Sequence, residues 1–498
     1  MDSLLSDVEL LMKNFSTSGY FFSFFFWGVL LFPFQIFGDE VVSSEVENGV
    51  FADAASPGDK KASPLPPTAL PRAIEDARQW DRQDLPLLYA PKYIAFSDDL
   101  YLSFGADFRL RFDGIENRNF QEEEFRPGTF QRWMTHGEVG TQSFRGFVQL
   151  KGTLAQGPGP IRGIDADPLA MHQAFGELRD RQLGEWTFRL RAGRMELSEG
   201  RLLSLREGPN MRISYDGAWS EFRRENLIFR AMYLQPVEIN PGIFDNRSRW
   251  SNHLWRGSAA WTIWSEDQDA FRLEATYQEG YRLAQRYYRG TGEERRRTVG
   301  LRVDLQRTFS PGRFSLDLEA FGQMGRFEDL PIRAYRLAMQ TRWSFENQLL
   351  SPALLLTLDQ SSGDGGDQSA TLGTFQAYVP RGSYFSEFSF LAPSNLRVIA
   401  PGFEVSPGPL TLRLDLGRFW RTSTFDGLYS LGMVPFFERA DAGGSLVGDL
   451  LGLSAAWQLH RLASLHGGAV LFLPGDYTEP YGGVETIRYL TTWLILRY

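Results

Sequence analysis

The feature that most constrains the fold is an alternation of large apolar and charged side chains that starts at residue 101. In the stretch YLSFGADFRLRFDG, residues 101–114, leucine, phenylalanine and alanine occupy every second position from Leu102, and acids, arginines, serine and glycine lie between them. Successive side chains of a β-strand point to opposite faces of the sheet. A period of two therefore predicts a strand with one apolar face and one charged face.

The same alternation recurs in eight further segments up to the C-terminus. They are FRGFVQLKGTL (144–154), WTFRLRA (186–192), VGLRVDLQR (299–307), FSLDLEA (314–320), YRLAMQTRWSF (335–345), LTLRLDLGRFW (410–420), LLGLSAAWQLH (450–460) and LASLHGGAVLFL (462–473). Clusters of Gly, Pro, Asp and Asn separate these segments, and no long helical pattern lies between them. The pattern is typical of an all-β protein.

Three features favour a membrane barrel over a soluble sandwich, in which two sheets would cover each other's apolar faces. The predicted strands run for about 9 to 11 residues, the length that a tilted strand needs to cross a bilayer. Trp186, Trp343 and Trp457 lie on apolar faces, as an interfacial aromatic girdle requires. The final strand, TIRYLTTWLILRY, alternates up to Tyr498. We therefore predict a single transmembrane antiparallel β-barrel, because closure pairs every strand edge.

The N-terminal region has a different composition. Residues 20–37, YFFSFFFWGVLLFPFQIF, are apolar apart from Ser23 and Gln35 and are preceded by Lys13, which is the layout of a secretory signal peptide. A membrane anchor of near-minimum length is the alternative. We predict a cleaved signal peptide over residues 1–38, and export to the bacterial outer membrane.

The predicted domain organisation follows from these segments. Met12, which precedes Lys13 directly, is a candidate for the true start of the chain. Residues 39–90 are predicted to form a periplasmic linker, since they are rich in proline, alanine and serine. Residues 91–498 form the predicted barrel.

Charge and missing residue types exclude several classes of function. The net charge of -9 argues against a nucleic-acid partner. The chain has no cysteine, and its five histidines form neither an HExxH nor a GxSxG motif. We therefore expect no catalytic residues, no metal and no cofactor. An outer-membrane hydrolase with His136 or His172 as its base is the least favoured alternative.

Arginine provides nearly all of the positive charge, because lysine occurs only five times among 52 basic residues. A guanidinium group binds carboxylates through a planar, bidentate fork and stays charged in dry surroundings. The bias towards arginine indicates a surface that binds anions. A GC-rich genome is the alternative source of the same bias.

Several motifs carry a family resemblance. Residues 193–218, GRMELSEGRLLSLREGPNMRISYDGA, continue directly from the strand WTFRLRA. Downstream elements follow in the order SGD (362–364), GTF (373–375), PRGSYF (380–385), SNL (394–396), FWR (419–421) and DGLY (426–429). With the first strand, these elements resemble the alginate export family of outer-membrane barrels over roughly residues 90–498. The chain departs from the family pattern at Met195, where glutamine is common, and at Asp113, where glutamate is common.

The resemblance implies a barrel of about eighteen strands whose arginine-rich lumen passes an anionic, uronic-acid polysaccharide out of the cell. A polymer with one carboxylate per sugar needs repeated guanidinium groups that bind weakly enough to release it. The predicted lumen path consists of Arg109, Arg111, Arg145, Lys151, Arg189, Arg191, Arg194, Arg206 and Arg212. The predicted charge-balancing acids are Asp107, Asp113, Glu177, Glu196 and Glu207.

A general or anion-selective porin for small solutes is the main alternative, because it keeps the fold and the arginines and changes only what passes. Expected partners are outer-membrane lipids and lipopolysaccharide, the anionic polysaccharide and periplasmic export scaffold proteins. The terminal aromatic Tyr498 resembles the signal read by the barrel-assembly machinery. The turn-rich segments 113–131 and 359–395 are candidates to fold over the pore.

Overall fold

The computed structural model describes residues 72–81, 87–97, 99–159, 161–204, 210, 212–345, 350–380, 384–388, 390–437 and 443–498. Every described residue belongs to one compact unit, residues 44–498. The predicted signal peptide of residues 1–38 and the candidate start at Met12 lie outside the described residues. So does most of the predicted linker of residues 39–90.

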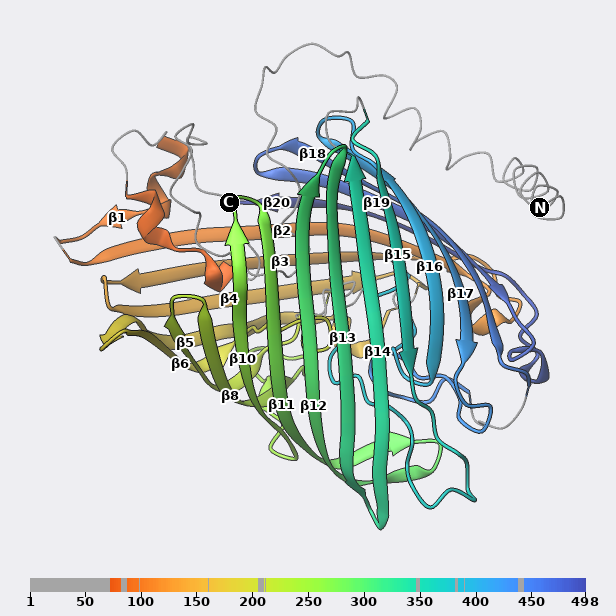
Figure 1. Ribbon diagram of the computed structural model, residues 1–498. Coiled ribbons are helices and arrows are strands. Elements are labelled where there is room, and N and C mark those ends of the chain that lie inside the picture. The colour runs from red at the N-terminus through yellow and green to blue at the C-terminus, as the bar shows by residue number, and fades with distance from the viewer. Residues whose placement is uncertain are drawn as a thin grey trace, which may run out of the picture. The chain divides into compact units, whose positions relative to one another are not determined.

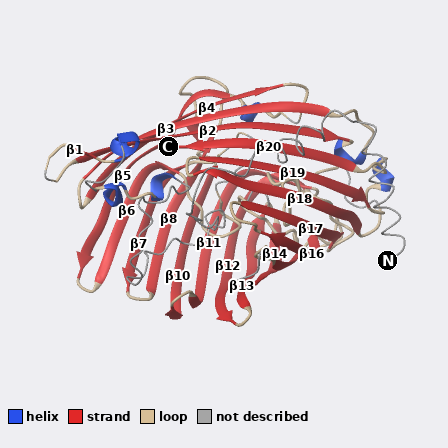
Figure 2. Ribbon diagram, turned by 90° about the horizontal axis from the view of Figure 1, so that it is seen from above, coloured by secondary structure: helices blue, strands red, loops and turns tan. Residues whose placement is uncertain are grey.

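Eighteen long strands form one closed antiparallel β-barrel (Figure 1). Each strand pairs with the next along the wall, and the last strand pairs with the first, with Ile495 opposite Arg109. In the view turned by 90°, the strand labels follow one another round the wall in chain order (Figure 2). The predicted fold class, an all-β barrel of about eighteen strands, is confirmed.

The strands of the wall are β2 (Tyr101–Glu116), β3 (Arg126–Gly140), β4 (Phe144–Gln156), β5 (Asp167–Leu183), β6 (Trp186–Met195), β7 (Tyr215–Arg224), β8 (Leu227–Glu238), β10 (Asn252–Glu266), β11 (Asp269–Tyr287), β12 (Gly290–Phe309), β13 (Gly312–Phe327), β14 (Leu330–Phe345), β15 (Ala353–Ser361), β16 (Leu396–Val405), β17 (Leu410–Arg421), β18 (Leu446–His460), β19 (Ala463–Pro474) and β20 (Ile487–Arg497). Two short strands, β1 (Ile94–Ala95) and β9 (Arg247–Ser248), pair with β2 and β8. The 3-10 helices are η3 (Arg72–Ile74), η4 (Ala77–Trp80), η5 (Leu87–Lys92), η6 (Arg118–Phe120), η7 (Gly163–Asp165) and η8 (Glu479–Tyr481).

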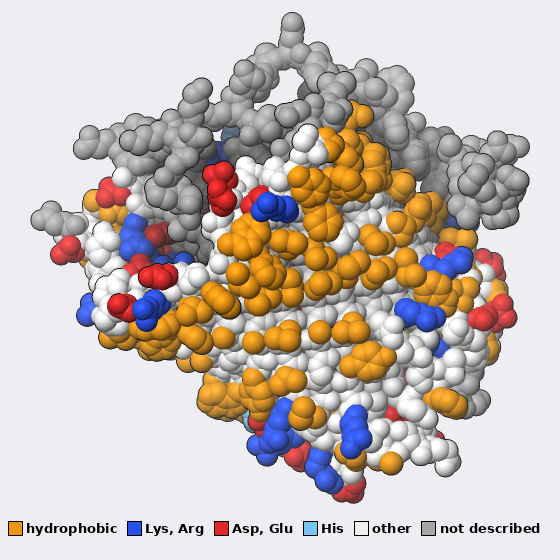
Figure 3. Space-filling model, viewed as in Figure 1, with side chains coloured by type: hydrophobic (Ala, Val, Ile, Leu, Met, Phe, Trp, Pro, Cys, Tyr) orange, Lys and Arg blue, Asp and Glu red, His pale blue; other side chains and the backbone are white. Residues whose placement is uncertain are grey.

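The two faces of the wall follow the alternation of the sequence. On β2, Phe108 and Leu110 are 36% and 40% exposed, whereas Arg109 between them is 2% exposed. The apolar set therefore faces outward and the charged set faces the interior. Figure 3 shows the consequence on the outside, where hydrophobic side chains form a broad band over the strands, with charged side chains at its lower edge. A lipid-facing surface requires such a band.

Several strands extend beyond the predicted segments. The alternation predicts a strand over residues 299–307, but β12 runs from Gly290 to Phe309. Its outward-facing Arg295 and Arg297 form ion pairs with Glu279 of β11. The hydrogen-bonded ladder thus continues past the apolar band, where water can solvate charged side chains on both faces.

The two ends of the barrel differ in the length of their connections. At one end, strands join through two-residue turns such as 184–185, 225–226 and 267–268. At the other end, the connections include residues 362–395 and 422–445. Outer-membrane barrels have short periplasmic turns and longer extracellular loops. The short-turn end is therefore the periplasmic end.

Within the part of the chain that the structure describes, no helix is long and apolar enough to cross a membrane.

Candidate functional site: the lumen of the barrel

Charged side chains on the inner face pair across neighbouring strands. Arg145 on β4 lies 2.6 Å from Glu138 on β3 and 3.6 Å from Glu177 on β5. Glu177 also accepts a hydrogen bond of 2.9 Å from Arg191 on β6. All four side chains are buried. Burying an unpaired charge in the low-dielectric wall costs free energy. An acidic side chain opposite a basic one on the neighbouring strand reduces this cost.

The same arrangement continues along the wall. Arg230 on β8 lies 2.8 Å from Glu221 on β7. Arg336 on β14 lies 2.9 Å from Glu319 on β13 and 2.8 Å from Asp359 on β15. We call these pairs, together with those on β3 to β6, the ion-pair belt. Its members are Glu138, Arg145, Glu177, Arg191, Glu221, Arg230, Glu319, Arg336 and Asp359.

Two long connections at the extracellular end fold into the barrel and meet there. Residues 196–204 follow β6, and residues 362–395, described over 362–380, 384–388 and 390–395, follow β15. The backbone amide of Ser204 donates to Val379 O, and the amide of Val379 donates to Leu202 O, both at 3.0 Å. The two loops thus form a short parallel bridge inside the lumen and narrow it together.

The loop of residues 362–395 also contacts the inner wall on both sides of this bridge. The amide of Arg333 on β14 donates to Leu372 O at 3.0 Å. The hydroxyl of Tyr384 donates to Asp359 at 2.7 Å, and the ring of Phe388 lies 4.9 Å from that of Tyr489 on β20. The predicted pore-covering segment 359–395 therefore splits into the end of β15 and an inward-folded loop.

The loop of residues 196–204 places the guanidinium group of Arg201 beside β13. Arg201 lies 3.0 Å from Asp317 and 3.3 Å from Glu319, both on β13. Its side chain is 12% exposed, so it keeps some contact with the lumen. Arg201 was not among the predicted path residues, although it lies within the motif-bearing stretch 193–218.

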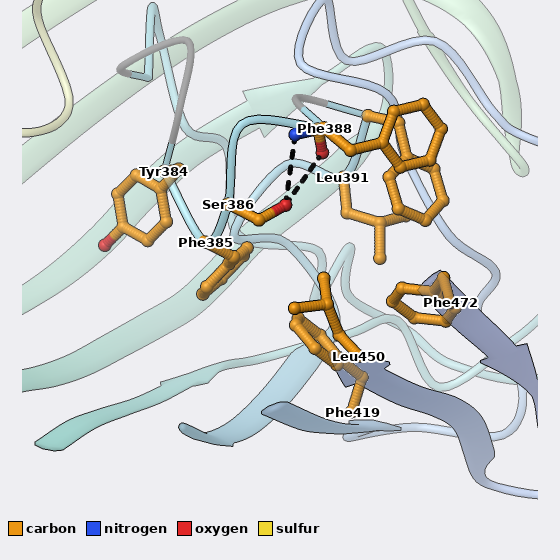
Figure 4. A pocket seen from close by; sticks show the side chains of 9 residues that line it. Tyr384, Phe385, Ser386, Phe388, Leu391, Phe419, Leu450 and Phe472 are labelled. Carbon is orange, nitrogen blue, oxygen red and sulfur yellow. Dashed lines mark hydrogen bonds between the residues drawn. The ribbon is translucent and has the colours of Figure 1, made fainter. Parts of the chain in front are cut away.

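An aromatic cluster packs the loop of residues 362–395 against β17 to β19. Figure 4 shows a small apolar cavity between the loop and the wall. Its lining residues are Tyr384, Phe385, Ser386, Phe388, Phe390, Leu391, Phe419, Leu450 and Phe472. Phe385 meets Phe419 edge to face at 5.4 Å, and Phe390 meets Phe472 at 5.2 Å. Such edge-to-face pairs add to the stabilisation from apolar burial.

A buried carboxylate links the loop of residues 362–395 to the extracellular loop of residues 422–445. Asp426 accepts hydrogen bonds from the amide of Asp364 at 2.8 Å, from the hydroxyl of Thr374 at 2.6 Å and from that of Tyr429 at 2.8 Å. Burial, which outweighs these donors, raises the pKa of Asp426 to about 6. The packed loops therefore bind a proton more tightly than released loops would.

This shift predicts that acid tightens the packing of the loops. Because the pKa of Asp426 is raised in the packed state, the packed loops become more stable as pH falls, and they lose this stability as pH rises through 6. Between pH 7 and 5 the gain is about 1 kcal/mol. Protection of residues 362–395 against proteinase K should increase accordingly, and Asp426→Asn should abolish the increase. Weaker protection at pH 5 in the unmodified protein would contradict the prediction.

The structure places most of the predicted basic path residues in the wall. Arg109, Arg111, Arg145, Lys151 and Arg191 are buried on wall strands, and Arg212 is buried in the connection between β6 and β7. Arg111 lies 2.7 Å from Asp113, and Arg212 lies 2.7 Å from Glu196. Lys151 lies 3.3 Å from Asp167, an acid that was not predicted. These groups hold the barrel together from inside, as the predicted acids Asp113, Glu177 and Glu196 also do; Asp107 is buried on the inner face of β2.

The remaining predicted positions divide three ways. Arg189 lies on the inner face, 2.7 Å from Asp180, and is 38% exposed. Arg194 lies on the outer face of β6, the face that also carries Trp186 and Phe188. Its guanidinium group pairs with Asp216 at 2.8 Å. The predicted lumen position of Arg194 does not agree with this outward orientation. Arg206 and Glu207 lie outside the described residues.

Two lumen-facing arginines near the periplasmic end were missed. Arg342 on β14 lies 2.7 Å from Glu404 on β16, and Arg413 on β17 lies 2.7 Å from Asp415. Their side chains are 35% and 37% exposed although they face inward. The same alternation that marks Arg109 also marks these positions, so the sequence contained the signal.

Both histidines considered for catalysis lie on wall strands, His136 on β3 and His172 on β5. The ring of His136 stacks on Phe147 at 5.2 Å. His172 lies 2.6 Å from Glu196, and both histidines are buried in the wall. Among the described residues, no group of three or more histidine or acidic side chains could hold a metal ion.

A closed barrel with an apolar outer band and a charged interior narrowed by two loops defines an outer-membrane channel. The model of the alginate export family matches residues 100–489, and the chain belongs to this family. No curated protein matches the chain.

Solved structures with the same fold include proteins of Pseudomonas aeruginosa, among them the outer membrane protein OpdK. OccK8 (OprE) shares 12% identity at a TM-score of 0.53, covering 80% of this chain and 98% of its own. OccD3 (OpdP) shares 12% at a TM-score of 0.53, covering 80% and 91%. OpdK, solved with vanillate, shares 12% at a TM-score of 0.51, covering 79% and 98%. At this identity the similarity shows the fold alone.

Proposed function

We propose that the channel passes an anionic, uronic-acid polysaccharide out of the cell, with guanidinium groups along the lumen as its binding sites. The observation that carries the proposal is the set of inward-facing arginines that remain partly exposed. Arg201 lies at the constriction, and Arg342 and Arg413 lie towards the periplasmic end. Successive guanidinium groups of moderate exposure suit a polymer that carries a carboxylate on every sugar.

Each of these arginines already has an acidic partner, and this supports passage rather than tight binding. A carboxylate of the polymer would exchange with Glu404 at Arg342 or with Asp415 at Arg413. Exposed ion pairs are worth only about 0.2 to 1 kcal/mol each. The exchange is therefore nearly isoenergetic, so the polymer can advance from one site to the next.

A second candidate is a porin for small carboxylates. The structure of OpdK with vanillate shows that a barrel of this fold holds a small aromatic acid. The same arginines would serve either solute. We favour the polymer because the family model covers nearly the whole barrel.

Outer-membrane lipids, lipopolysaccharide and periplasmic export scaffold proteins remain the partners that this function requires. Tyr498 is the residue that we propose is read by the barrel-assembly machinery.

Single-channel recording of the refolded protein in a planar bilayer distinguishes the polysaccharide channel from the small-carboxylate porin. A salt gradient measures ion selectivity, and polymannuronate or polyguluronate is then added to the periplasmic side. An anion-selective current that polyuronate blocks and neutral dextran does not would support the polymer. Anion selectivity with block by vanillate alone would instead assign a small-carboxylate porin.

The double variant Arg342→Gln/Arg413→Gln should weaken block by polyuronate by about threefold to tenfold, since it removes two exposed pairs of up to about 1 kcal/mol each. Anion preference should fall as well. The matched control is Arg418→Gln, because Arg418 lies on the outer face of β17 and pairs with Asp449. Equal effects of the double variant and the control would remove these two residues from the path.

A further inference from the structure

The last part of the predicted linker is folded onto the periplasmic end of the barrel. We call residues 72–81 and 87–92 the N-terminal segment; its helices η3, η4 and η5 lie near β1 and the C-terminus (Figure 1). The hydroxyl of Tyr498 donates to Leu88 O at 2.6 Å. The segment is thus held at the seam where the first and last strands meet.

The start of the segment lies inside the barrel. Ala73 is fully buried in a cluster that contains Phe147 and Met195 of the inner wall. Arg145, a member of the ion-pair belt, donates to Ala73 O at 2.5 Å and to Glu75 O at 3.3 Å. A flexible spacer outside the barrel would not bury a residue among side chains of the lumen.

Ion pairs tie the next residues to the ends of the strands. Arg78 lies 2.7 Å from Asp76 and 3.0 Å from Asp180 at the end of β5. Asp76 in turn lies 3.6 Å from Arg179. The segment therefore offers a carboxylate and two carbonyl groups to Arg145 and Arg179 on the inner wall.

Cation–π contacts hold the rest of the segment across the mouth. The buried rings of Trp80 and Tyr89 stack at 5.5 Å. The guanidinium of Arg461, in the turn between β18 and β19, lies 5.8 Å from each ring. Lys92 lies 4.9 Å from the ring of Tyr498. The contacts thus reach from β4 and β5 to the turn after β18.

We propose that the N-terminal segment is a tethered plug that closes the periplasmic mouth of the channel and is displaced when the channel opens. It occupies Arg145 and Arg179, basic groups near the periplasmic entrance. Its ion pairs are partly exposed, and each ion pair or cation–π contact is worth about 2 kcal/mol or less, so that release is reversible. The short connection to β2 gives the plug an effective concentration of about millimolar, which keeps weak contacts occupied.

Two variants test the plug without altering the barrel wall. Arg78→Ala/Trp80→Ala removes the ion pair with Asp180 and the stacked ring. In the second variant, an equal-length Gly-Ser stretch replaces residues 73–80, which removes every side chain of that stretch. Conductance in KCl, with no polymer present, should rise at least severalfold in both. Proteinase K should cleave the released segment, while heat-modifiable migration shows that the barrel is folded.

The control is Ile74→Ala/Gln79→Ala, which changes two exposed side chains of the same segment and should leave conductance unchanged. A synthetic peptide of residues 72–92 should restore the low conductance of the Gly-Ser variant from the periplasmic side only. Unchanged conductance in a folded, cleavable Gly-Ser variant would overturn the plug. Because the readout is the KCl current, failure of the plug leaves selectivity and polymer block to be judged separately.

Discussion

Leu110→Arg is expected to prevent assembly of the barrel or to weaken it severely. Leu110 lies near the middle of β2, faces outward and is 40% exposed. It stands opposite Leu494 of β20, at the seam that closes the barrel. An arginine on the lipid face near the bilayer midplane costs about 2 to 4 kcal/mol. Urea unfolding in lipid vesicles measures this loss, and heat-modifiable migration measures the folded fraction.

The matched control for this prediction is Leu183→Arg. Leu183 is also exposed and is paired with the outward Trp186, but it lies at the very end of β5 beside a two-residue turn. Near the membrane interface the same substitution costs only about 0 to 1 kcal/mol. Equal stability of the two variants would show that Leu110 does not face lipid at midplane depth.

The sequence predicts the barrel well where both faces of a strand keep their character. On β2, the inward Arg109 lies between the outward Phe108 and Leu110. On β14, the inward Arg336 lies between the outward Tyr335 and Leu337. Some of the strands that the alternation did not detect are interrupted by small residues, proline or glycine. On β10, the inward Ser258 and Ala260 are small, so the alternation with Trp255 and Trp261 is less distinct. β16 is interrupted by Pro401 and Gly402.

The site could be predicted only in part, for a different reason. Local alternation identifies which side chains face inward, and the pairing of Arg111 with Asp113 follows from their spacing on one face. It cannot show which inward groups remain in contact with water. That depends on the loops of residues 196–204 and 362–395, whose inward folding joins segments far apart in the chain. The exposure of Arg342 therefore required the structure.

Arg336→Met is expected to destabilise the barrel by about 3 to 5 kcal/mol, the second large effect. Arg336 is fully buried, and so are its partners Glu319 and Asp359. Removing the guanidinium leaves two carboxylates in the wall without their main compensating charge, which is costlier than removing a whole ion pair. Tyr384 also donates to Asp359, so the loop of residues 362–395 should loosen and conductance should become noisier. Urea unfolding and single-channel noise are the measurements.

Restoration of charge balance separates an electrostatic effect from a loss of packing. The triple variant Arg336→Met/Glu319→Gln/Asp359→Asn keeps the shape of the acids and removes their charge, and Arg201 retains Asp317 as a partner at 3.0 Å. Because neutral replacements of a buried ion pair are often tolerated, this variant should recover most of the lost stability. Tyr384→Phe, which removes only a hydroxyl, should loosen the loop and leave the barrel intact. If Arg336→Met alone costs less than about 1 kcal/mol, with both acids still ionised, water must solvate them, and the ion-pair belt is then a water-filled surface that an anionic polymer could reach.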